Sequence, residues 1–204
     1  MTRHYFSLLA LGDSYTIGEA VPLHESFPYQ AVQLLREEGI HIHAPEIVAK
    51  TGWTTFELAE HILHSKLNEH YDFVTLLIGV NNQFRGLSAA DYTTDFEFLL
   101  HKAIHFAGGK TDHVIVLSIP DYGVTPFAKK MDPKNIATAI DAFNAINHRI
   151  AIAQKVQYID ITGLSMKAAK DASLLAPDGL HPSGSAYAQW ARLVADEILQ
   201  RVTH

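Results

Sequence analysis

The chain has no cysteine among its 204 residues, which excludes both a disulfide framework and a thiol nucleophile. It has no block of basic residues and a formal net charge of −6, which argues against a nucleic-acid surface. No stretch approaches the ~20 apolar residues that a membrane-spanning helix needs. Neither a G-x-G-x-x-G motif nor a phosphate-binding loop follows the first apolar run. The sequence thus disfavours nucleic-acid binding, a membrane span and cysteine chemistry.

The composition is that of a globular protein, with 48% apolar and 19% charged residues. We expect a single domain over residues 1–204, large enough to bury roughly 70% of the surface that the unfolded chain exposes. Arg3 and His4 precede only about seven apolar residues without a small-residue cleavage site, so we interpret this segment as a strand rather than a signal peptide. A cytoplasmic location is favoured for the chain as given. A secreted or periplasmic location stays open if a signal peptide was removed.

Thirteen histidines raise the question of a metal site. Pairs at spacings of two, three and four residues are His41 with His43, His61 with His64, and His101 with His105. No pair is joined by a carboxylate or a third ligand in a recognisable zinc pattern. We therefore interpret these histidines as solvated and expect no metal site.

Strand-like and helix-like segments alternate five times along the chain. Apolar runs predict buried strands at 5–11, 46–49, 73–78, 114–119 and 156–161. Apolar periodicity and end signals predict helices at 26–38 and 88–107. Three further helices are predicted: one that begins at 54, one that ends near 154 and one that follows 185. In the helix that begins at 54 we expect Phe56, Ala59, Ile62 and Leu63 to be buried. The alternation predicts a three-layer α/β protein with a parallel sheet and right-handed crossovers.

Polar residues of interest follow four of the predicted strands. Ser14 lies in a Gly-Asp-Ser turn after the first strand, Gly52 follows the second and Asn81 the third. Asp178 and His181 follow the fifth strand. Because parallel strands place their carboxyl ends at one edge of a sheet, we expect these loops to converge there.

The spacing of Asp178 and His181 suits nucleophilic catalysis at a serine. Pro182 biases His181 away from helical geometry and the Asp-Gly pair favours a tight turn, so the carboxylate can accept a hydrogen bond from Nδ1. This contact would leave Nε2 as a base facing Ser14. A serine hydroxyl is a poor nucleophile at neutral pH without such a base.

An attacked carbonyl also needs donors for the developing oxyanion, and the N–H groups of Gly52 and Ser14 and the amide of Asn81 are candidates. Taken alone, Gly52 is more typical of a turn residue and Asn81 of a strand-end cap. Candidate substrate-binding residues in these loops and in the connection 121–133 are Asp13, Asn82, Arg85, Tyr122 and Phe127. Arg85 would meet an anionic leaving group, and the aromatic residues would wall an acyl or aryl pocket. Solvation of the arginine and local packing of the aromatic rings are the alternatives.

Four blocks of the sequence resemble, in their order and spacing, those of the SGNH hydrolase family, also called GDSL-type lipases/esterases. The blocks are G-D-S-Y, the glycine of T-G-W-T-T, G-V-N-N and D-G-L-H-P, and they span essentially the whole chain. The resemblance implies a flavodoxin-like α/β/α fold with a five-stranded parallel sheet of order 2-1-3-4-5. It also implies serine ester hydrolysis without a cofactor. Thr51 stands where the family commonly has serine, and the glycine that the chemistry uses follows it.

The resemblance assigns Ser14 as nucleophile, His181 as base and Asp178 as the partner that orients the base. Gly52 and Asn81, with the Ser14 N–H, correspond to the oxyanion hole. We expect a two-step acyl transfer through an acyl-enzyme on a small or short-chain ester.

Other functions stay open on the same scaffold. Lysophospholipase, thioesterase and carbohydrate O-deacetylase activities would use the same site. A catalytically silent ligand-binding protein would have lost a residue of the triad or oxyanion hole, and none is missing here. A nucleotide or phosphate binder is disfavoured because Asp13 would repel phosphate. The sequence gives no indication of the oligomeric state.

Overall fold

A five-stranded sheet forms the centre of the computed structural model, which describes residues 5–202. Arg3 and His4, used above to argue against a signal peptide, lie outside the described residues. The strands are β1 (Leu8–Gly12), β2 (Glu46–Ala49), β3 (Phe73–Leu77), β4 (Val114–Leu117) and β5 (Gln157–Ile159). All pairs are parallel and the order is β2-β1-β3-β4-β5, which confirms the predicted fold.

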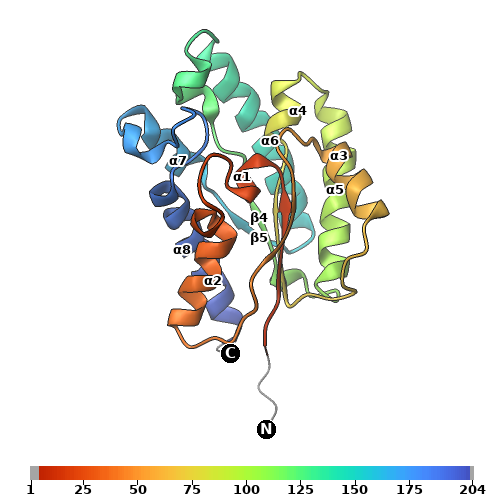
Figure 1. The fold of residues 1–204 in the computed structure, drawn as a ribbon. Helices are drawn as coiled ribbons and strands as arrows, with labels where there is room; N and C mark the ends of the chain where they lie inside the picture. The colour runs from red at the N-terminus through yellow and green to blue at the C-terminus, as the bar shows by residue number, and fades with distance from the viewer. Residues whose placement is uncertain (1–4, 203–204) are drawn as a thin grey trace.

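Helices cover both faces of the sheet (Figure 1). The α-helices are α1 (Ser14–Ile17), α2 (Phe27–Glu37), α3 (Thr55–His64), α4 (Val80–Phe84), α5 (Ala89–Phe106), α6 (Pro133–Ala153), α7 (Thr162–Ser165) and α8 (Gly184–Val202). Short 3₁₀ helices are η1 (Leu23–Glu25), η2 (Thr111–His113), η3 (Tyr122–Val124), η4 (Pro126–Ala128), η5 (Met166–Ala169) and η6 (Ala172–Leu174). Helices α2 and α8 pack together on one face, whereas α3, α5 and α6 lie on the other (Figure 1).

The three central strands β1, β3 and β4 are buried along their whole length, as their apolar sequences predict for strands covered on both faces. The edge strands β2 and β5 are only partly buried. Helix α8 contributes Tyr187, Trp190, Val194 and Ile198 to the core.

The first strand begins later than predicted. Tyr5 is exposed beside the rings of His41 and His43, and Phe6 forms only an isolated bridge with Ile42. The continuous ladder starts at Leu8, which pairs with Phe73 of β3, and pairing with β2 begins at Leu9. The fifth strand is likewise shorter than its apolar run because it has a partner on one side only.

The face that α3 buries differs from the predicted one. Phe56 and Leu63 are 60% and 52% exposed, so their predicted burial was wrong. The capping box between Thr54 and Glu57 fixes the start of the helix. From that start the buried positions are Thr55, Leu58, Ala59 and Ile62, and Phe56 and Leu63 lie outside this arc. No helix among residues 5–202 combines the length and hydropathy needed to cross a bilayer.

Candidate active site

Ser14 is the first residue of α1, directly after β1 at the carboxyl edge of the sheet. Asp13 caps this helix, and its Oδ1 accepts a hydrogen bond from the Tyr15 N–H at 3.0 Å. The first N–H groups of a helix lack intrahelical acceptors, so the Ser14 N–H is available to a ligand. The strand end and the cap thus hold a largely buried hydroxyl in a fixed place.

The side chains of Ser14, His181 and Asp178 form one hydrogen-bonded line. His181 Nε2 lies 2.9 Å from Ser14 Oγ, and its Nδ1 lies 2.6 Å from Asp178 Oδ2. The other oxygen of Asp178 accepts the N–H groups of Leu180 and His181, each at 3.0 Å. One carboxylate therefore closes the turn and orients the imidazole.

The ionisation of Asp178 follows from its contacts. Burial would raise the pKa of Asp178, but hydrogen bonds from His181 and from the turn N–H groups outweigh it and lower that pKa. The ionised Asp178 accepts a hydrogen bond from the Nδ1–H of His181, which leaves Nε2 to accept a hydrogen bond from the Ser14 hydroxyl.

The imidazole also packs against an aromatic ring that the sequence did not single out. The rings of Tyr15 and His181 lie 5.2 Å apart, and Tyr15 in turn packs against Trp190 of α8. These buried rings restrict rotation of the His181 side chain. The position next to Ser14 was the only available signal for Tyr15.

A cavity of about 90 Å³ lies beside the serine. Ser14, His181 and Asn81 form its polar side, and Phe84, Tyr122 and Phe127 line it with aromatic rings. The ring centroids are 6.0 Å apart for Phe84 and Tyr122, and for Phe84 and Phe127. Tyr122 and Phe127, which were predicted to bind substrate, both line this cavity. Phe84 was missed, although it lies one helical turn after Asn81.

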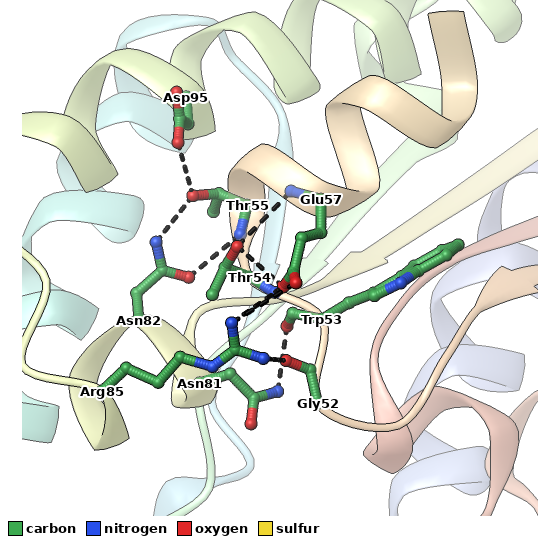
Figure 2. A network of polar contacts seen from close by, with 9 residues as sticks. All are labelled: Gly52, Trp53, Thr54, Thr55, Glu57, Asn81, Asn82, Arg85 and Asp95. Atoms are coloured by element: carbon green, nitrogen blue, oxygen red, sulfur yellow. Dashed lines mark hydrogen bonds and ion pairs between the residues drawn. The ribbon is translucent and has the colours of Figure 1, made fainter. Parts of the chain in front are cut away.

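Gly52 lies in a turn that closes with a hydrogen bond of 3.2 Å from the Trp53 N–H to the Lys50 carbonyl. Its φ of +83° is the value that the third residue of a type II turn requires, and glycine adopts it without strain. The Asn81 amide donates from Nδ2 to the Trp53 carbonyl at 2.9 Å, and its second hydrogen is left for a ligand (Figure 2).

Two residues predicted to contact substrate lie away from the cavity. Asp13 and Asn82 are each only 1% exposed, and neither lines the cavity. The Asp13 carboxylate is used to cap α1. The Asn82 amide accepts from the Thr55 N–H at 3.0 Å and donates to Thr55 Oγ1 at 2.7 Å.

The guanidinium of Arg85, which was predicted to meet an anionic leaving group, contacts protein groups at and after the Gly52 turn. Nη2 donates to the Gly52 carbonyl at 2.5 Å, and Nη1 donates to Glu57 Oε1 at 3.3 Å (Figure 2). Among residues 5–202 no group of three or more His, Asp or Glu side chains is arranged to hold a metal ion.

A serine hydroxyl bonded to an imidazole, itself bonded to a carboxylate, at the carboxyl edge of a parallel sheet defines a serine hydrolase. A family model described as GDSL-like Lipase/Acylhydrolase matches residues 10–189. The chain belongs to this family and is a GDSL-family serine esterase/acylhydrolase.

Solved structures share the fold at low sequence identity, and no curated protein sequence matches the chain. The lipase/acylhydrolase from Enterococcus faecalis is 21% identical, with a TM-score of 0.75 and 96% of each chain covered. Axe2, an acetylxylan esterase from Geobacillus stearothermophilus, is 21% identical, with a TM-score of 0.74 over 97% of this chain and 96% of that one. The esterase EstA from Pseudoalteromonas sp. is 16% identical, with a TM-score of 0.69 over 97% of this chain and 99% of that one.

Proposed function

We propose that the chain hydrolyses small or short-chain carboxylic esters through an acyl-enzyme on Ser14. The observation that carries this proposal is the pair of contacts on one imidazole, 2.9 Å from Nε2 to Ser14 Oγ and 2.6 Å from Nδ1 to Asp178. These distances are within the range in which a base accepts the proton of a nucleophile.

In the first step His181 takes the proton of Ser14 as Oγ bonds to the ester carbonyl carbon. The imidazolium returns this proton to the departing alkoxide as the ester C–O bond breaks, leaving an acyl group on Ser14. Water then attacks the acyl carbon and gives a proton to His181, which passes it to Oγ as the acid departs. Asp178 holds the imidazole and stabilises its charged form in both steps.

The carbonyl oxygen becomes negatively charged in both steps. The N–H groups of Ser14 and Gly52 and the amide of Asn81 are the donors for this charge, since each follows a different strand at the same edge of the sheet. Backbone and amide donors stabilise the oxyanion without help from a cofactor.

The size of the cavity limits the acyl group. A cavity of about 90 Å³ is small, which suits an acetyl or similarly short chain. The long acyl chains of lysophospholipids and fatty-acyl thioesters would extend beyond it. An O-acetylated sugar is a second candidate, because its acyl part is equally small and its bulky alcohol would remain outside.

Ser14→Ala tests the proposal. The variant should lose hydrolysis of p-nitrophenyl acetate and labelling by a fluorophosphonate probe, whereas the exposed Ser185→Ala should retain both. Full activity in a folded Ser14→Ala would contradict the proposal. A series of acyl chain lengths, compared with a panel of acetylated sugars, separates the two substrate candidates.

A further inference from the structure

The proposed oxyanion donors lie on two elements that are far apart in the sequence. Gly52 belongs to the turn after β2, whereas Asn81 belongs to the short helix α4 after β3. Donors must lie within about 2.7–3.1 Å of the developing oxyanion to act on it. Something must therefore fix the turn relative to the helix.

Helix α4 holds this turn at two consecutive carbonyl groups (Figure 2). Asn81 at its start donates to the Trp53 carbonyl at 2.9 Å, and Arg85 at its end donates to the Gly52 carbonyl at 2.5 Å. A guanidinium is a fixed planar fork, so a contact from it also sets the direction of the carbonyl.

The guanidinium is itself held in place. Arg85 Nη1 lies 3.3 Å from Glu57, whose carboxylate accepts the Thr54 N–H at 2.8 Å as part of the capping box of α3. Glu57 thus joins Arg85 to the segment that leaves the turn. The arginine contacts Gly52 itself and Glu57 after it, although its own side chain is 45% exposed.

We propose that Arg85 is a positioning residue that holds the Gly52 turn against α4, so that the Gly52 N–H stays aimed at the oxyanion beside Asn81. This inference rests on the proposed function. A residue of this kind supports the transition state more than the bound substrate, so its loss lowers kcat with little change in KM.

The test compares Arg85→Ala with Arg36→Ala. Arg36 makes the same kind of contact, from Nε and Nη2 to the Ile42 carbonyl at 3.0 and 2.9 Å, but Ile42 precedes β2 at the opposite edge of the sheet. We expect kcat on p-nitrophenyl acetate to fall about 10- to 100-fold in Arg85→Ala, less than the loss of a whole donor. Arg36→Ala should stay within about twofold of the wild type.

Two further measurements separate positioning from a general loss of stability. Millimolar guanidinium chloride should restore part of the activity of Arg85→Ala, because the ion can occupy the vacated site beside Gly52, and it should leave the activity of Arg36→Ala unchanged. Arg85→Lys keeps the positive charge but not the planar guanidinium group, and it should show an intermediate kcat. If Arg85→Ala does not fold, Arg85→Lys provides the test.

Unchanged kcat in folded Arg85→Ala and Arg85→Lys would overturn the inference, as would an equal fall of kcat in Arg36→Ala. A raised KM for anionic esters with unchanged kcat would instead make Arg85 a contact of the leaving group. Each of these results leaves the proposed function intact as long as Ser14→Ala is inactive. Activity in Ser14→Ala would overturn the proposed function itself.

Discussion

Asn81 and Asn82 are consecutive residues of α4, yet their side-chain amides serve different parts of the protein (Figure 2). Asn81 lines the cavity beside Ser14. Asn82 is buried and makes two hydrogen bonds to Thr55, whose hydroxyl in turn donates to Asp95. One amide side chain lines the cavity beside Ser14, and the next joins α4 to α3 and α5.

Substitution of Asn81 should therefore affect catalysis, whereas substitution of Asn82 should affect stability. Asn81→Ala should lower kcat by about 10²–10³-fold, the usual cost of one oxyanion donor. Asn82→Ala leaves the buried Thr55 N–H without its acceptor and should lower the free energy of unfolding by about 1–3 kcal/mol. Steady-state kinetics and urea unfolding of both variants check this. A larger loss of kcat in a stable Asn82→Ala would contradict the division of roles.

The stability of the protein should depend on pH through Asp13. Burial raises the pKa of this carboxyl to about 7 from 3.8, and hydrogen bonds from backbone N–H groups only partly offset the shift. Between these values the folded protein keeps a proton that the unfolded chain has released, so stability falls as the pH rises from about 4 through 7.

Asp13→Asn carries no charge at any pH and keeps an oxygen that can accept the Tyr15 N–H. Its free energy of unfolding should match that of the wild type near pH 4 and exceed it at pH 8, by up to about 4 kcal/mol. Urea unfolding at both pH values measures the difference. A difference that is independent of pH would show that the carboxyl is ionised throughout.

A methyl group at Gly52 should affect catalysis beyond its cost in stability. Gly52 and Gly39 have φ values of +83° and +80°, and neither added Cβ would meet an atom closer than 3.6 Å. Both alanine variants should therefore lose about 1–2 kcal/mol of stability from backbone strain alone. Only Gly52→Ala should also lose kcat, because relaxation of its turn moves the N–H. Equal kcat in the two variants would exclude Gly52 from the oxyanion hole.

The aromatic wall should set the preferred length of the acyl chain. Phe84→Ala and Phe127→Ala enlarge the cavity, so the ratio of kcat/KM for p-nitrophenyl hexanoate over acetate should rise about tenfold. Phe56 is an exposed phenylalanine on α3 outside the cavity, and Phe56→Ala should leave the ratio unchanged. A ratio that stays constant in all three variants would mean that the acyl group binds elsewhere.

Much of the architecture could be predicted from local patterns. Covered parallel strands produce continuous apolar runs, and each run here ends in small or polar residues such as those at Gly12, Gly79 and Pro120. Because parallel strands end at one edge, the sequence positions of Ser14 and His181 were enough to expect their side chains to meet. That expectation needs only the topology, which follows from the alternation of strands and helices.

Other features depended on the tertiary structure. Periodicity suggested an apolar face for α3, but the packing of the helix on the sheet decided its rotation and left Phe56 and Leu63 in solvent. The inward amide of Asn82 and the contact between Arg85 and the Gly52 carbonyl are equally invisible in the sequence. The chain alone determined which chemical groups reach the catalytic edge. Only the folded protein decided which way each side chain points, because direction depends on partners tens of residues away.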